Sequence, residues 1–134
     1  MNLPTQWIVG FVDGEGCFHI QCNPQPSMTT GYQVLCEFVV TQHERDIKVL
    51  YALKAHFGCG VVRQEKKSIY CYRVRAHAHH RDKIVPFFEA HRLKTRKYEA
   101  FIRYRRVVLL MEAKKHLTAE GLALIRALRE RNLR

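Results

Sequence analysis

Two acidic residues, Asp13 and Glu15, end the short apolar stretch that covers residues 7–12 of this 134-residue chain. Acidic side chains oppose the partial negative charge at the C-terminus of a helix, so two of them at that end indicate a chemical use. Gly10 and Gly14 lie one helical turn apart, and their lack of Cβ atoms would let a second backbone approach that face.

The alternative interpretation of this stretch is an ordinary core helix that ends at a glycine. Gly16 follows the second acid, and we expect it to end the helix with a positive φ angle. A core helix would account for the apolar residues and for the glycine. It would not explain why both acids stand at the unfavourable end, so we ask which elements would position them.

The chain is strongly basic, with 23 Lys and Arg residues against 12 Asp and Glu residues and a net charge of +11. A small domain of this charge favours nucleic acid or an anionic membrane as its partner. No apolar run approaches the roughly twenty residues that span a bilayer, and no basic amphipathic segment carries an exposed aromatic face. We therefore expect nucleic acid, no membrane, and a single domain at residues 1–134.

The cysteines predict neither a structural zinc site nor a disulfide framework. The cysteines are odd in number, and no two form a CxxC pair. The apolar stretch at residues 7–12 begins too close to Met1 to leave room for a secretory signal. The protein is therefore not expected to be secreted. His77, His79 and His80 form a small cluster that could bind metal, but the favoured interpretation is solvated or phosphate-facing side chains in a loop.

Apolar periodicity predicts an α+β fold in the order αββαββα, with extra C-terminal helices. Its four antiparallel strands would form a saddle-shaped sheet backed by the helices. Strands are expected at residues 17–23, 32–41, 61–65 and 68–76, and helices at residues 42–57, 80–91 and 96–115 and after Thr118. The helix at residues 96–115 is expected to bury Tyr98, Phe101, Ile102, Val108 and Leu109.

The face of this sheet that points away from the helices is expected to be polar, basic and concave. Arg63, Arg73 and Arg75 fall on it within one hairpin, and a two-stranded ribbon fits the major groove of double-stranded DNA. Leu35 and Val39 suit contacts with thymine methyl groups, unless their strand is buried on both faces. The expected DNA contacts are Cys17, His19, Gln21, Asn23, Gln33, Leu35, Glu37, Val39, Arg63, Glu65, Cys71, Arg73 and Arg75.

Residues 8–16 resemble, position by position, the LAGLIDADG signature of homing endonucleases. In that family the motif is a helix that packs against its twin, and its last acid binds a divalent metal at the base of the twin helices. The resemblance assigns metal binding to Glu15 and the Gly14 carbonyl, and gives Asp13 a structural position that caps a neighbouring element. Because the chain has one motif, a homodimer is implied. Its interface residues would be Val9, Gly10, Asp13 and Gly14.

The resemblance extends over nearly the whole chain. Residues 38–42 resemble the family strand that ends in a polar active-site residue, which makes Gln42 the residue that positions solvent. Residues 93–97 resemble the basic segment that supplies an active-site lysine. We assign that lysine to Lys94, with Arg96 and Lys97 as alternative registers. The implied catalytic set is Glu15, Gln42 and Lys94.

Two positions depart from the family pattern. Asp46 stands one turn after Gln42, where some relatives carry a basic residue, and the adjacent Arg45 is the alternative for that role. Glu15 stands where close relatives often carry Asp. Both acids offer hard oxygen ligands, so we expect metal binding to survive this change.

The resulting hypothesis is a homing endonuclease that binds a long pseudo-palindromic DNA site as a homodimer and hydrolyses both strands. The expected cofactor is Mg²⁺, with Mn²⁺ as a substitute. An intron RNA maturase or a non-cutting DNA-binding protein on the same fold is the alternative. A dimeric transcriptional regulator ranks last because no helix-turn-helix is evident. The resemblance implies an organelle (chloroplast or mitochondrion) or the prokaryotic cytoplasm as the location.

Overall fold

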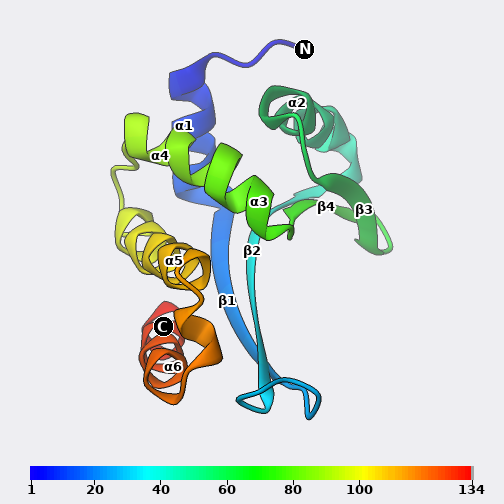
Figure 1. Ribbon diagram of the computed structural model, residues 1–134. Helices are drawn as coiled ribbons and strands as arrows, with labels where there is room; N and C mark the ends of the chain where they lie inside the picture. The colour runs from blue at the N-terminus through cyan, green and yellow to red at the C-terminus, as the bar shows by residue number, and fades with distance from the viewer. Residues whose placement is uncertain (134) are drawn as a thin grey trace.

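The computed structural model describes residues 1–133, and Arg134, the last residue of the expected domain, lies outside them. A four-stranded antiparallel sheet with strand order β1-β2-β4-β3 forms the centre of the fold (Figure 1). Its strands are β1 Gly16–Pro24, β2 Tyr32–His43, β3 Val61–Lys66 and β4 Ile69–Val74. The helical segments are α1 Thr5–Glu15, η1 Glu44–Asp46, α2 Ile47–Phe57, α3 His77–His79, η2 His80–Ile84, α4 Val85–Ala90, α5 Lys97–Glu112, η3 Lys115–Leu117 and α6 Ala119–Asn132. The predicted α+β class is confirmed.

Phe18 on β1 lies at the centre of the hydrophobic core. Its ring centroid is 5.0 Å from that of Tyr104 on α5, 5.2 Å from Phe38 on β2 and 5.6 Å from Phe88 on α4. Buried aromatic rings contribute large apolar areas, so this cluster fixes the helices against one face of the sheet. The alternation along each strand then directs the other face away from the helices.

The second strand is longer than the sequence predicted. β2 continues through Gln42, which pairs with Tyr70 of β4, and through His43. The predicted helix start at residue 42 is therefore wrong. Helical backbone begins only at η1, where His43 Nδ1 accepts a hydrogen bond from the Arg45 N–H at 3.2 Å. The partner strand keeps this segment extended, and Gln42 consequently lies near the end of a strand.

The histidine cluster is not a solvated loop, and that prediction is wrong. His77 and His79 belong to α3, while His80 opens the π-helical segment η2 and is only 1% exposed. Burial lowers the pKa of His80 to about 4, so its ring is neutral. Its Nε2–H donates to the Cys36 carbonyl at 2.8 Å, and its Nδ1 accepts from the Tyr104 hydroxyl. These contacts connect η2 to β2 and α5.

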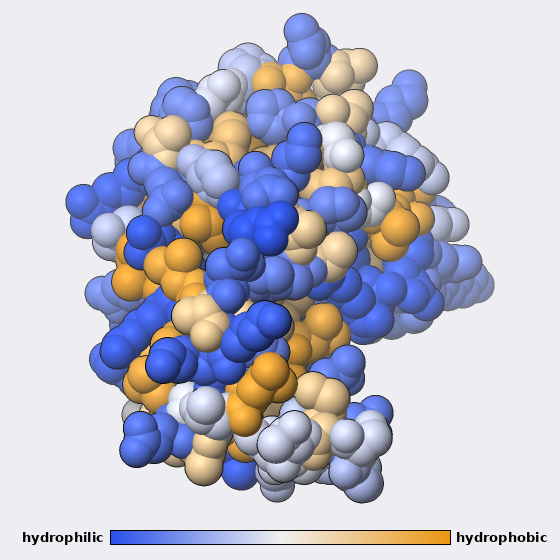
Figure 2. All heavy atoms as spheres, viewed as in Figure 1, coloured by the Kyte–Doolittle hydropathy of each residue, from blue (hydrophilic) through white to orange (hydrophobic). Residues whose placement is uncertain are grey.

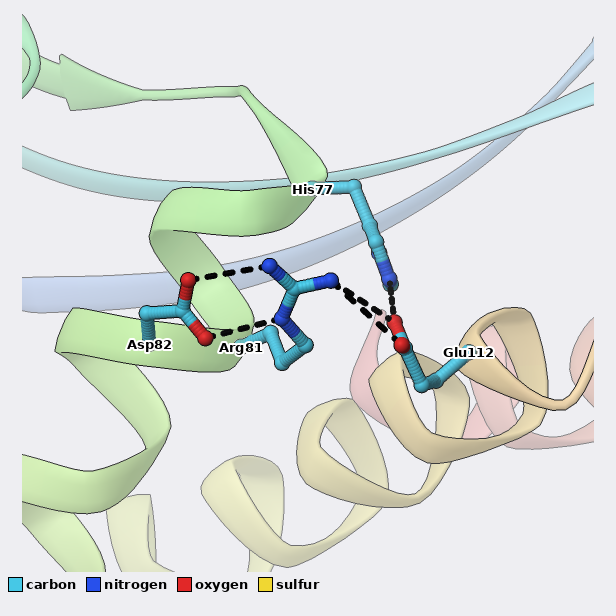
Figure 3. Close-up of polar contacts among 4 residues, drawn as sticks. All are labelled: His77, Arg81, Asp82 and Glu112. Atoms are coloured by element: carbon cyan, nitrogen blue, oxygen red, sulfur yellow. Dashed lines mark hydrogen bonds and ion pairs between the residues drawn. The ribbon is translucent and has the colours of Figure 1, made fainter.

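An exposed ion-pair network links the same helical segment to the end of α5 (Figure 3). Arg81 donates two hydrogen bonds to Asp82, at 2.8 and 2.9 Å, and one of its Nη atoms lies 3.4 Å from Glu112. His77 Nε2 lies 2.7 Å from the Glu112 carboxylate. Exposed ion pairs contribute little to stability, so the buried contacts of His80 hold η2 more than this network does.

The buried face of α5 differs from the predicted one. Ile102 and Leu109 were predicted to be buried but are 39% and 46% exposed. Successive residues lie about 100° apart around a helix, so neighbours of buried positions can face solvent. Figure 2 shows hydrophobic atoms interspersed with hydrophilic ones over this region. The buried residues of α5 are Phe101, Tyr104, Val107 and Val108.

Helix α6 is fixed at both ends. Thr118 caps its start as predicted, because its Oγ1 accepts the Gly121 N–H at 3.0 Å. At the other end, Asn132 Nδ2 donates to the Ala100 carbonyl at 3.1 Å and to the Phe18 carbonyl at 3.4 Å. The last turn of α6 is therefore held against α5 and β1. Within residues 1–133, none of the helices combines the length and apolar character needed to cross a membrane.

The buried His80 predicts a pH-dependent stability. An unfolded histidine titrates near pH 6.5 and the folded one near pH 4, so stability is complete above pH 6.5 and falls as the pH drops through that window. The expected loss is up to about 3 kcal/mol, measured by urea unfolding at several pH values. His80→Gln should flatten this dependence, while His79→Gln, at a half-exposed position, should leave it unchanged. Parallel curves for all three proteins would contradict the assignment.

Candidate active site and nucleic-acid interface

Helix α1 has one buried face and one open face. Ile8, Val9 and Val12 are at most 1% exposed and pack into the core. The predicted interface contact of Val9 is therefore wrong, because its side chain points into its own protomer. Gly10 and Gly14 are exposed, and a Cβ added at either would meet no atom within 4 Å. The glycine face of α1 is thus open to another molecule.

Helix α1 passes into β1 without a loop. Glu15 ends the helix and Gly16 begins the strand. The φ angle of Gly16 is −85°, so the predicted positive φ is wrong. The residue is needed for space instead, because a Cβ at Gly16 would lie 2.7 Å from Cγ1 of Val12. This close packing holds Glu15 in a defined place at the edge of the sheet.

The Asp13 carboxylate caps the segment that leads into α5. Its two oxygens accept hydrogen bonds from the Lys94 N–H at 2.8 Å, the Thr95 N–H at 3.1 Å and the Thr95 hydroxyl at 2.8 Å. Burial raises the pKa of Asp13, but these hydrogen bonds and the charge of Lys94 outweigh it and hold the pKa below its usual value. Asp13 therefore fixes the basic segment beside the end of α1.

Glu15 is the acid that remains available. Its side chain is exposed, and it forms no ion pair or hydrogen bond with any other side chain in residues 1–133. With the carbonyl of the exposed Gly14 it offers hard oxygen donors that fit a divalent cation. Within the part of the chain that the structure describes, no group of three or more His, Cys, Asp or Glu side chains could hold a metal. Glu15 is therefore not grouped with two further side chains of these types in residues 1–133.

The two candidate lysines have different surroundings. The Lys97 Nζ donates to the Gly16 carbonyl, at the helix–strand junction itself. The Lys94 side chain is exposed, and its backbone N–H is held by Asp13.

The remaining candidate site residues lie at the end of β2 and just after it. Gln42 is half-buried near the end of β2. Arg45 and Asp46, which compete for the remaining basic position, are both exposed in η1.

A groove of about 630 Å³ runs along the start of β1, between that strand and α5 and α6. A hydrogen bond with His19 lowers the pKa of the Cys17 thiol and raises that of the His19 ring. The groove is predominantly basic, which favours an anionic ligand beside the junction. It is lined by Cys17, Phe18, His19, Arg96, Lys97, Glu99, Ala100, Arg103, Arg131 and Asn132.

The register of the sheet brings the predicted DNA contacts onto one face. Cys17 pairs with Val39, Val39 pairs with Arg73, and Arg73 pairs with Val61, so these four residues form a row across all four strands. Val61 is 47% exposed and was not predicted as a contact. The period-two pattern that placed Arg63 on this face would also have placed Val61 there. Further pairs on this face are His19 with Glu37, Gln21 with Leu35, Asn23 with Gln33, and Arg63 with Cys71.

Two of the predicted contacts are not accessible. Cys71 is 1% exposed, and burial is the main cause that raises its pKa to about 11. Glu37 is 6% exposed, and its carboxylate is occupied by the side chains of Gln21 and Arg75. The expectation that Cys71 and Glu37 touch DNA directly is therefore wrong for this structure, because neighbouring side chains cover both.

The fold is shared with solved homing endonucleases. I-TnaI matches with a TM-score of 0.93 and 50% identity, over 96% of this chain and 87% of that one. I-SmaMI, bound to an uncleaved DNA target in the presence of calcium ions, matches with a TM-score of 0.92 and 34% identity, over 95% of this chain and 44% of that one. A profile of LAGLIDADG endonucleases matches residues 8–108. The chain belongs to the LAGLIDADG endonuclease family.

Curated relatives have similar names. Probable intron-encoded endonuclease 2 of Neurospora crassa is 30% identical over 117 residues, which are 87% of this chain and 24% of that protein. Probable intron-encoded endonuclease Cox1-I1b of Schizosaccharomyces pombe is 31% identical over 109 residues, which are 81% of this chain and 28% of that protein. The chain therefore spans about a quarter of the length of these curated relatives.

The contacts of Asp13 predict a cost for its removal. Asp13→Ala deletes the acceptor for two backbone N–H groups and a hydroxyl, and we expect a loss of about 1–2 kcal/mol in the free energy of unfolding. Urea unfolding at pH 7 measures it. Asp46→Ala, at an exposed position in η1, should cost less than about 0.5 kcal/mol. Equal losses for the two variants would show that the cap contributes nothing particular.

Proposed function

We propose that residues 1–134 form one endonuclease domain that acts as a homodimer on double-stranded DNA. The observation that carries the proposal is the exposed Glu15, without a side-chain partner in residues 1–133, at the end of a helix whose glycine face is open. Two such helices packed through Gly10 and Gly14 would bring two copies of this acid together. A two-fold interface of this kind uses the same surface on both protomers.

The proposed dimer determines the length and the symmetry of the DNA target. Each protomer would lay the outer face of its sheet in the major groove, and the two sheets would be related by the two-fold axis. One helical turn per protomer corresponds to a site of roughly 20 base pairs in total. Two-fold symmetry of the protein also makes the target approximately palindromic. A net charge of +11 would supply the phosphate attraction that brings the protein to DNA.

The residues near the junction suit hydrolysis of a phosphodiester. Glu15 and the Gly14 carbonyl of each protomer would hold Mg²⁺, or Mn²⁺ in its place, between the two copies. A divalent cation bound there supplies the Lewis acidity that activates water and stabilises the charge on the phosphate. Gln42, near the end of β2, would orient the attacking water. Cleavage of both strands follows from having two symmetry-related sites.

The surroundings of the lysines support Lys94 as the charge-stabilising residue. Lys97 is engaged with the Gly16 carbonyl, which gives it a role in holding the helix–strand junction. Lys94 has an exposed side chain on a backbone that Asp13 fixes in place. Its ammonium group can therefore approach a phosphate without first breaking a contact within the protomer.

Binding without cleavage is the main alternative, either to DNA or to intron RNA. It would require the basic face but no unpartnered acid at the end of α1, so the exposure of Glu15 favours cleavage. The relative Cox1-I1b also bears on location, because Cox1, from which it takes its name, is a mitochondrial gene. It supports an organelle, and a mitochondrion in particular, as the place of action.

The metal assignment predicts the behaviour of Glu15→Gln. Loss of the carboxylate should lower cleavage of a selected duplex by at least about 100-fold, or about 2.7 kcal/mol, in the presence of Mg²⁺. The dissociation constant for the same duplex should change less than about threefold. A plasmid-nicking assay and a binding titration measure the two effects. Glu120→Gln, at an exposed position of α6, is the matched control, and undiminished cleavage by Glu15→Gln would refute the assignment.

The open glycine face predicts the effect of Gly10→Leu. Within the protomer nothing lies within 4 Å of the new Cβ, and leucine favours a helix more than glycine by up to about 1 kcal/mol. The variant should therefore fold at least as stably as the wild type but fail to dimerise, as sedimentation would show. Ala55→Leu adds a similar side chain at an exposed position of α2 and should leave the oligomeric state unchanged. A dimer of undiminished strength in Gly10→Leu would place the interface elsewhere.

A further inference from the structure

Glu37 is an unusual residue for the outward face of a nucleic-acid-binding sheet. Together with His80 it is one of two buried polar residues in the described part of the chain. Unlike His80, it lies on the face with Arg73 and the other basic side chains, where a carboxylate would repel phosphate if it were exposed. Its 6% exposure shows that neighbouring groups enclose it.

The enclosing groups come from both neighbouring strands. From β1, Gln21 Nε2 donates to Glu37 Oε1 at 3.0 Å. From the other side, the Nε of Arg75, just beyond the end of β4, donates to Oε2, and the Nε of Arg73 lies 3.8 Å from the same oxygen. A central strand thus holds one carboxylate between a glutamine and two arginines. These side chains converge from the strands on both sides, so Glu37 organises the middle of the face.

Both arginines meet Glu37 through Nε. Neither Nη atom of either arginine makes a hydrogen bond within residues 1–133. The side chain of Arg73 is 20% exposed and that of Arg75 is 49% exposed. The Arg75 Nε hydrogen-bonds to the carboxylate, which fixes the plane of that guanidinium and leaves an outer pair of N–H donors free, whereas Arg73 is drawn to the same oxygen as an ion pair at 3.8 Å. Two parallel donors of this kind match O6 and N7 of guanine in the major groove. The pair of valines beside Arg73 in the register, Val39 and Val61, would border that contact with apolar surface.

We propose that Glu37 is a positioning residue for base recognition: it aims Arg73 and Arg75 at guanines of G·C pairs in the target. The proposal rests on the proposed function, since it presupposes DNA on this face. One carboxylate against two guanidinium groups leaves the trio with a single net positive charge. It therefore attracts phosphate less than two unpaired arginines would, and more of its binding free energy depends on the base that it meets.

The test is selection of bound duplexes from a random library, without divalent metal, by wild type and Glu37→Gln. Glu37→Gln should lose discrimination for G at the base pairs under the arginines, on the order of tenfold. Its affinity for a scrambled duplex should stay equal or rise. Asp82→Asn is the matched control, because it also removes a carboxylate beside an arginine but on the helical layer. It should leave the base preference unchanged.

Two results would overturn the proposal. One is an unchanged base preference in Glu37→Gln. The other is a uniform loss of affinity for selected and scrambled duplexes, which would give Glu37 a purely structural role. If wild-type protein selects no sequence, the proposed function fails as well. Loss of cleavage with an intact selected sequence concerns only the catalytic assignment, so the two failures can be distinguished.

A second set of variants does not depend on the folding of Glu37→Gln. Arg73→Lys and Arg75→Lys keep the charge but lose the planar pair of donors. Because both arginines share one carboxylate, their effects on base preference should overlap and deviate from additivity by threefold or more in the double variant. Additive effects at separate base pairs would mean that Glu37 does not couple the arginines, and would also overturn the proposal.

Discussion

The direct passage from α1 into β1 determines where the remaining functional groups lie. Glu15 and Gly16 are consecutive residues of a helix and a strand, so the backbone of Glu15 has a fixed relation to the sheet. The junction is held by the Asp13 cap on one side and by the Lys97 contact with Gly16 on the other. A reacting group gains most from such prior positioning, because little freedom remains to be lost on binding.

The middle of β2 shows how the helical layer and the outer face are joined. On the helical side, His80 donates to the carbonyl of Cys36. On the outer side, the next residue, Glu37, holds the arginines. Burying a polar group costs free energy unless it has a hydrogen-bond partner. His80 and Glu37 both have such partners, and these contacts lie on opposite faces of the sheet at two adjacent positions of β2. The strand at this point is consequently restrained from both sides, which gives the arginines a rigid base.

The α+β order, the outer face of the sheet and the cap by Asp13 could all be predicted from the sequence. Period-two alternation assigns Arg63 and Arg73 to one face whatever the exact register, and the resemblance of residues 8–16 to the family motif implies the capping role of Asp13. The burial of Glu37 could not be predicted, since it depends on Gln21 and Arg75 converging from different strands. The burial of His80 depends likewise on a π-helical turn, for which the local sequence carries no clear signal.

The open glycine face of α1 has a consequence for how such proteins diversify. In a symmetric pair every substitution on the sheet appears twice, so neither half of the recognised sequence can drift alone. This chain covers only 44% of I-SmaMI, a chain more than twice the length of the matched part. If a gene duplication joined two such units in tandem, the same helix packing could persist while each copy accumulated its own mutations. Departure from palindromic targets would then require no change in the packed helices.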